Sequence, residues 1–227
     1  GILETKVGGA DCVISQTGFT GEKGYEIYVR DAHENAEKMW NAVLEAGEEF
    51  GLMVIAPAHH RRIAAGILSW GQDLDHETSP FQVNLSYQVP RNKAADYIGK
   101  EELEKQRAMM DEGKAPFKMK MVGLTLGGKE ITDYAPDFWI VTNTDGDEVG
   151  YVTSPWWSPE LETNIALAWV PWEASEVGTK YMVKLPDEYA ESPGVAVNAE
   201  IVDVPFRESV NPNKREVQAA KGLDFAD

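Results

Sequence analysis

Residues 17–29, TGFTGEKGYEIYV, are the stretch from which the fold of this chain can be predicted. Three glycines interrupt the first half, and aromatic, acidic and aliphatic residues alternate in the second half, which predicts a turn that leads into a β-strand. Successive side chains of a strand point to opposite faces. We therefore expect Glu26 and Tyr28 on one face of a sheet and Tyr25, Ile27 and Val29 on the other, buried face.

The carboxylate of Glu26 has two interpretations. At the start of a rigid strand, beside aromatic rings and glycines that allow close backbone approach, it suits recognition of a flat heterocycle with adjacent N–H donors, such as a pteridine. The other interpretation is an ordinary β-hairpin whose Glu26 faces solvent. Both stay open on these residues alone.

Strand and helix patterns alternate through the first half of the chain. The predicted strands are residues 2–7, 11–16 and 82–89. The predicted helices follow a cap at Asp31, run from Pro57 towards Gly66, and cover residues 100–110. This mixture predicts an α+β fold with a layered first domain.

The second half of the chain is dominated by strand patterns joined by turns. Six short strands are predicted at residues 118–126, 138–143, 148–153, 164–170, 180–185 and 195–204. Such a succession predicts a small antiparallel β-barrel. The polar stretch at residues 111–116 is the predicted boundary, so the expected domains are 1–113, with a partial α/β region, and 114–207, with the barrel, followed by a terminal arm at 208–227.

Three tryptophans stand in polar surroundings. Trp156 and Trp157 lie between prolines in a predicted loop at residues 154–159, where they could line a pocket or pack at a domain interface. Trp70 could stack on a heterocycle, although burial in the core is the favoured interpretation. The acidic residues that follow Trp70 are interpreted as a polar turn.

Residues 59–62, HHRR, are the main basic cluster. Adjacent histidines diverge by about 100° on a helix, so no two-ligand metal face results and no metal site is predicted. The cluster is either a solvated turn or a place where Arg62 meets an anionic group.

Composition excludes several classes of function. Lys and Arg number 21 against 38 Asp and Glu, for a formal charge of −17, which disfavours binding to nucleic acid or to an anionic membrane. The single cysteine, Cys12, lies in an apolar strand pattern and is expected to be buried. No run approaches the roughly 18 apolar residues of a membrane span, so a cytoplasmic location is expected.

The order of the motifs carries a family resemblance. GYEIYV at residues 24–29, GILSWGQDLDHETSPF at 66–81, YIGKEEL at 97–103 and GYVTSPWWSP at 150–159 follow one another in an order similar to the glycine-cleavage T-protein (aminomethyltransferase) family and its tetrahydrofolate-dependent demethylase relatives. The resemblance implies tetrahydrofolate as cofactor and a C-terminal barrel. It assigns the pterin contact to Glu26. Tyr25, Arg62 and Trp70 are the other residues expected at the cofactor site, and Trp156 and Trp157 are expected to shape a substrate pocket.

Two departures from the family pattern affect the predicted function. Ala58 and Ala64 stand where the family has arginine and glutamate. The family also has a long N-terminal portion that carries its catalytic aspartate, so a missing N-terminal domain or a companion chain is the expected partner, beside a small-molecule methyl donor. The catalytic group is therefore not assigned within this chain.

These departures and the tryptophan-rich segment favour a demethylase of a small substrate such as an aryl methyl ether. The alternatives are a glycine-cleavage aminomethyltransferase, a non-catalytic folate-binding module, and an amine-dehydrogenase subunit with the same fold.

Overall fold

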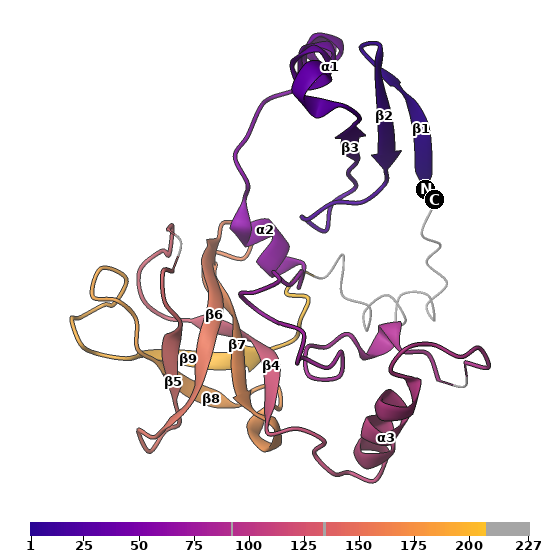
Figure 1. The fold of residues 1–227 in the computed structure, drawn as a ribbon. Coiled ribbons are helices and arrows are strands. Elements are labelled where there is room, and N and C mark those ends of the chain that lie inside the picture. Colours follow the sequence, from indigo (N-terminus) through magenta and orange to yellow (C-terminus); the bar gives the residue numbers. More distant parts are fainter. Residues whose placement is uncertain (92, 134, 208–227) are drawn as a thin grey trace, which may run out of the picture. The chain divides into compact units, whose positions relative to one another are not determined.

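The computed structural model describes residues 1–91, 93–133 and 135–207 (Figure 1). The predicted terminal arm at residues 208–227 lies outside the described residues. The chain divides into two compact units, of which the first is Gly1–Ala58 and the second begins at His59. Each unit is described by itself.

The first unit is a three-stranded antiparallel sheet with one long helix. Its elements are β1 (Ile2–Val7), β2 (Ala10–Ser15), β3 (Glu26–Val29), α1 (Ala32–Gly47) and a 3₁₀ turn at Glu48–Phe50. Gly8 and Gly9 both adopt positive φ and close the tight turn between β1 and β2. A side chain at Gly8 would place its Cβ 2.6 Å from the Cβ of Ala42, so glycine also allows α1 to approach the sheet.

The strand register separates two faces of this sheet. Cys12 pairs with Val29 and Ser15 pairs with Glu26, so Cys12 and Glu26 lie on opposite faces. Cys12 is buried at 2% exposure, as predicted, under the helix that contacts all three strands. Asp31 begins α1 as expected, but with a positive φ and without a side-chain capping hydrogen bond.

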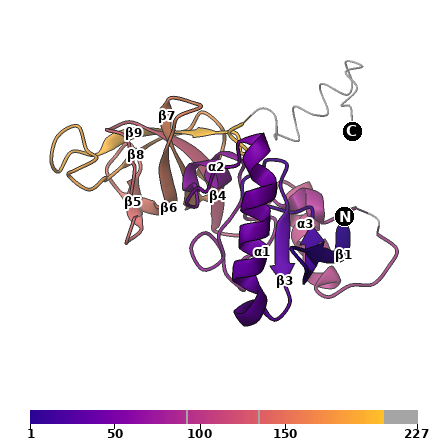
Figure 2. The same cartoon turned by 90° about the horizontal axis from the view of Figure 1, so that it is seen from above.

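The second unit is built around a closed six-stranded barrel, which confirms the predicted α+β class and barrel. In chain order its strands are β4 (Met119–Leu126), β5 (Trp139–Thr142), β6 (Glu148–Ser158), β7 (Thr163–Pro171), β8 (Lys180–Val183) and β9 (Val197–Val202). Around the barrel the order is β4-β7-β6-β5-β8-β9, with antiparallel pairing throughout. Figure 2 shows this barrel from a second direction.

Alternation along the strands supplies two apolar clusters. Val122, Leu124 and other inward side chains fill the barrel. Met121, Ile165 and Leu167 lie on the outer face of β4 and β7 and pack with Ile63 of α2 (His59–Ala64). The helix α2 is thereby fixed on the outside of the barrel.

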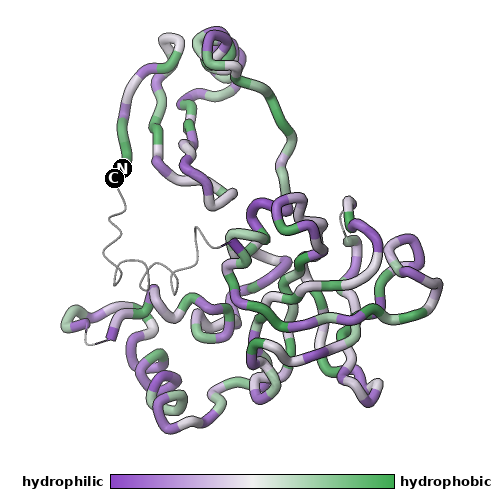
Figure 3. The backbone as a smooth tube through the Cα atoms, turned by 180° about the vertical axis from the view of Figure 1, so that it is seen from behind, coloured by the Kyte–Doolittle hydropathy of each residue, from purple (hydrophilic) through white to green (hydrophobic). Residues whose placement is uncertain are grey.

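The remaining helices of this unit bury no residue. They are α3 (Lys100–Asp111) and two 3₁₀ turns at Ser86–Gln88 and Trp172–Ala174. α3 matches the predicted helix and buries no residue, and it is largely hydrophilic in Figure 3. No helix among the described residues has the length and apolar character needed to cross a membrane.

Two predicted elements are wrong. Residues 82–89 form turns and a 3₁₀ helix rather than a strand, because Asn84 adopts a left-handed conformation and Leu85 N–H bonds back to Pro80 O. The predicted loop at residues 154–159 is mostly strand, since β7 supplies partners for β6 as far as Ser158. The predicted boundary between residues 113 and 114 lies inside the second unit and stays a prediction.

Candidate functional site

The first candidate site is the Glu26 carboxylate of the first unit. Its Oε2 accepts a hydrogen bond from the hydroxyl of Tyr28 at 3.1 Å and another from Thr17 Oγ1. The bond to Glu26 is the main cause that raises the pKa of Tyr28, so the phenol stays a donor near neutral pH. A strand neighbour and a turn residue thus fix the carboxylate from two sides.

One carboxylate oxygen remains available for a ligand. In the part of the chain that the structure describes, both bonds recorded for the Glu26 carboxylate end on Oε2, and none ends on Oε1. The turn before β3 is open, since a Cβ added at Gly18 would meet nothing within 4 Å. The prediction that Tyr25 lies on the buried face is wrong. Its side chain is 60% exposed, because it precedes the first paired residue of β3.

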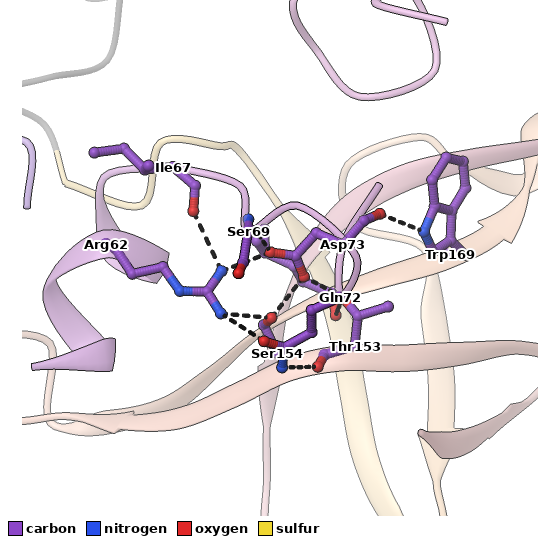
Figure 4. Close-up of polar contacts among 9 residues, drawn as sticks. Arg62, Ile67, Ser69, Gln72, Asp73, Thr153, Ser154 and Trp169 are labelled. Atoms are coloured by element: carbon purple, nitrogen blue, oxygen red, sulfur yellow. Dashed lines mark hydrogen bonds and ion pairs between the residues drawn. The ribbon is translucent and has the colours of Figure 1, made fainter. Parts of the chain in front are cut away.

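The second candidate site is a buried polar cluster in the second unit, drawn in Figure 4. Arg62 NH1 forms an ion pair with Asp73 Oδ2 at 2.6 Å, and the side chains are 2% and 0% exposed. The same Oδ2 accepts from Ser69 N at 2.7 Å. Oδ1 accepts from Thr153 Oγ1 at 2.6 Å and from Ser154 Oγ at 2.5 Å. Every acceptor position of this carboxylate is therefore used inside the protein.

A β-bulge explains how two consecutive residues reach one carboxylate. The register of β6 against β7 shifts between Val152 and Ser154, so Thr153 is the extra residue of the strand. Adjacent side chains of a regular strand would point to opposite faces. At the bulge, Thr153 and Ser154 both bond to Asp73.

The cluster ties four segments together. Arg62 comes from α2, Asp73 from the following turn, and Ser154 from β6, while Trp169 of β7 donates its indole N–H to Asp73 O at 3.0 Å. Gln72 Nε2 adds a bond to Thr153 O at 2.7 Å. The cluster anchors the turn at residues 69–74 on the barrel.

This geometry changes the interpretation of Arg62. The predicted solvated turn is wrong for this residue, since it is buried. Its NH1 and NH2 groups bind the protein's own Asp73, Ser154 and Ile67 O, so they are not presented to an anionic ligand. Asp73 lies in the predicted polar turn, where it is buried as an anchor. Asp73 stands between Gln72 and Leu74 in a polar stretch, so the local sequence carries no signal for the pair.

The anchored turn exposes Trp70. Gly71 adopts a positive φ, and its N–H bonds to Leu74 O at 2.8 Å, which closes the turn. Trp70 is 68% exposed, so the favoured interpretation of a core residue is wrong. Its indole is available for stacking on a flat ligand.

Trp156 and Trp157 are both partly buried. Trp156 packs against the cluster under α2, and its ring lies 5.2 Å from that of His59. Burial, followed by the charge of Arg62, lowers the pKa of His59. Trp157 belongs to β6 and donates its backbone N–H to Ile131 O at 2.8 Å. Within the described residues no group of three or more His, Cys, Asp or Glu side chains could hold a metal ion.

Comparison with known proteins relates both units to one family. Residues 1–93 match the family model described as GCVT N-terminal domain, and residues 120–207 match the glycine cleavage T-protein C-terminal barrel domain. The interval between these two matches contains the predicted domain boundary. Two family models in the expected order thus account for most of the chain.

Individual relatives agree with these matches. An aminomethyltransferase from Geobacillus sp. (strain WCH70) is 33% identical over 205 residues, which are 89% of this chain and 51% of that protein. One from Clostridium botulinum (strain Okra / Type B1) is 35% identical over 79% of this chain and 46% of its own length. The chain thus spans about half the length of these relatives.

A solved structure shows the same fold. The crystal structure of glycine cleavage system aminomethyltransferase T from Bartonella henselae superposes with a TM-score of 0.65 at 23% identity, covering 86% of this chain and 50% of that one. Together with the two family models and the curated relatives, the order of elements leads to one conclusion: the chain belongs to the glycine-cleavage T-protein family.

Proposed function

We propose that this chain forms the folate-binding part and the barrel of a tetrahydrofolate-dependent one-carbon transferase of the aminomethyltransferase type. The observation that carries the proposal is the Glu26 carboxylate, fixed through Oε2 and open at Oε1. Family membership and relatives named aminomethyltransferase support it.

The Glu26 site fits the edge of a pterin. That edge presents a ring N–H next to an exocyclic amino group, and a carboxylate can accept one hydrogen bond on each oxygen. Both hydroxyl donors use Oε2, so the open Oε1, with two lone-pair sites of its own, is the acceptor for the pterin edge. Thr17 and Tyr28 hold the carboxylate in place before binding, so less conformational freedom is lost on binding.

Bound tetrahydrofolate would supply a nitrogen nucleophile that accepts the one-carbon unit. In the first unit, Glu26 would fix the ring and Tyr25 offers an exposed aromatic surface beside it in the chain. In the second unit, described by itself, Trp70 is an exposed indole. Arg62 acts as a positioning residue, because it anchors the turn that carries Trp70. Orientation of this kind lowers the entropic part of the barrier.

Aminomethyl transfer is favoured over aryl ether demethylation. The aromatic loop that suggested an aryl substrate is part of β6, and its two tryptophans are partly buried. The curated relatives are named aminomethyltransferases. Ala58 and Ala64 still depart from the family pattern, so the demethylase is kept as the second outcome of a product assay.

Titration with tetrahydrofolate, followed by quenching of tryptophan fluorescence, tests the binding step. We expect saturable binding by the unaltered chain. Glu26→Gln should weaken it at least tenfold, because a hydrogen bond to a charged group contributes about 1.5–3 kcal/mol. Glu37→Gln makes the same charge change on an exposed position of α1 and should bind as tightly as the unaltered chain.

Equal affinity in Glu26→Gln and Glu37→Gln, with both variants folded by circular dichroism, would remove the Glu26 site from the proposal. The donor class is tested with ¹³C-labelled donors and mass analysis of the folate product. A methylene-bridged product indicates an aminomethyl donor, whereas an N-methyl product indicates a demethylase.

A further inference from the structure

The barrel has a seam beside β4 that the proposed function does not use. β4 pairs with β9 only from Gly123, opposite Val202, to Leu126, opposite Ala199. Before Gly123 the two strands separate, and the turn at residues 82–87, in place of β9, runs along β4. Met121 N–H bonds to Gln82 O at 2.8 Å, and Asn84 Nδ2 bonds to Met121 O at 3.0 Å.

Two hollows adjoin at this seam. The first has a volume of about 310 Å³ and includes Lys120, Ser86 and Ser175 in its lining. The second has a volume of about 210 Å³ and an apolar lining that includes Leu68, Val83 and Leu167. Asn84, Tyr87, Met121 and Val204 line both hollows, which makes them neighbours. Their volumes together fall in the range typical of small-molecule sites.

Lys120 is the cation of the seam. It belongs to the same face of β4 as Val122 and Leu124, which point into the barrel, and its ammonium group lies 5.3 Å from the centroid of the Trp172 ring. Burial lowers the pKa of Lys120. Among the residues that the structure describes, no carboxylate forms an ion pair with this ammonium group.

The charge of Lys120 is therefore partly desolvated without an internal counter-ion. Desolvation of a charge is unfavourable unless an opposite charge or hydrogen-bond partners compensate it. The Trp172 ring compensates only in part, because cation–π contacts are weaker than contacts with a carboxylate in a partly buried site. An anion from solution would complete the pairing.

The negative charges around Lys120 restrict which anions can bind there. The chain carries a formal charge of −17, and the exposed Asp203 also lines the first hollow, so a multiply charged anion such as a nucleotide is disfavoured. A single lysine matches a single negative charge. The adjoining apolar hollow adds a favourable contact for a hydrocarbon that is attached to that charge.

We propose that the seam binds a small amphipathic monocarboxylate, whose carboxylate pairs with Lys120 and whose hydrocarbon chain fills the hollow lined by Leu68, Val83 and Leu167. Asn84 contributes to the site by fixing the turn at residues 82–87 against β4. This ligand site lies wholly in the second unit and does not depend on folate binding.

Octanoate is the probe for the test. The indole N–H signal of Trp172, assigned by its loss in Trp172→Phe, is followed by NMR during titration of the unaltered chain. We expect a saturable shift. Octanamide should bind at least tenfold more weakly, since it lacks the charge. The dissociation constant should fall about fourfold for each methylene added from hexanoate to octanoate, as expected for burial of the chain.

Variants distinguish binding by the Lys120 ammonium group from an effect of the total charge of the chain. Lys120→Met, and the polar variant Lys120→Gln in case the first does not fold, should each bind octanoate at least tenfold more weakly. Lys184→Met removes the same charge from an exposed position and should keep the affinity of the unaltered chain. Circular dichroism checks that each variant is folded.

Three results of the comparisons would overturn the proposal, and so would a fourth from the titration itself. They are unchanged affinity in a folded Lys120 variant, equal binding of octanoate and octanamide, and an equal loss of affinity in Lys184→Met. Absence of any shift of the Trp172 signal would do the same. Since folate is absent from these titrations, none of the results bears on the Glu26 proposal.

Discussion

Asp73→Asn is expected to be among the most damaging single changes in the second unit. The substitution keeps the size of the side chain but removes the charge that faces Arg62 at 2.6 Å, where both side chains are almost fully buried. It also replaces an acceptor oxygen with an amide donor, although Ser69 N, Thr153 and Ser154 all donate to this carboxylate. Arg62 is left as a buried cation without its partner.

Removal of one partner of a buried ion pair usually lowers the free energy of unfolding by about 3–5 kcal/mol. The total stability of a domain is about 5–15 kcal/mol, so the loss is a large share of it. Urea unfolding at pH 7, followed by circular dichroism and tryptophan fluorescence, measures this change. Asp137→Asn makes the same substitution at an exposed position and should unfold at nearly the urea concentration of the unaltered chain.

A double-mutant cycle tests whether the two charges act as a pair. Arg62→Met combined with Asp73→Asn should be less destabilised than the sum of the single variants, because the second change removes the unpaired charge left by the first. A loss below about 1 kcal/mol in Asp73→Asn, or strictly additive single changes, would refute the assignment of this pair as the anchor of the turn.

Two further predictions concern the barrel and α2. Gly150→Ala should destabilise the barrel by about 1–3 kcal/mol in thermal unfolding, since the new Cβ would lie 2.1 Å from Trp169 O. In the control Gly18→Ala, the new Cβ meets nothing within 4 Å, so this variant should unfold like the unaltered chain. Burial lowers the pKa of His59 in the folded state, so unfolding takes up a proton, and the free energy of unfolding should fall as the pH drops through the ordinary histidine range. His59→Asn should lose less of this free energy between pH 7 and pH 5. The same pH dependence of stability in the variant and the unaltered chain would contradict this.

Local patterns in the sequence were enough to predict much of the fold. Short strand patterns joined by turn signals predicted the six barrel strands. β4 and β7 are buried on both faces, since their outer side chains pack with α2, whereas β9 alternates buried and exposed residues. The same alternation predicted the face of Glu26, which the register with Ser15 bears out. Glycine-rich turns and the helix over residues 100–110 also depend on short-range preferences.

The contacts of the buried cluster required the tertiary structure. Arg62 and Asp73 are 11 residues apart, and Ser154 is 92 residues from Arg62, so no local pattern relates the three. Their pairing depends on α2 packing over β6 and β7 and on the bulge at Thr153. A basic residue in a polar segment predicts solvent exposure unless the counter-charge is known.

The sequence by itself determined most of the strands and helices and which face of β3 carries the acid, because these depend on neighbours within a few residues. Only the tertiary structure decided that Trp70 is exposed, that residues 154–158 extend β6, and that Arg62 is internal. The physical reason is that burial and pairing depend on which distant groups compete with water for a side chain or a backbone amide. Those groups come together only when the barrel closes.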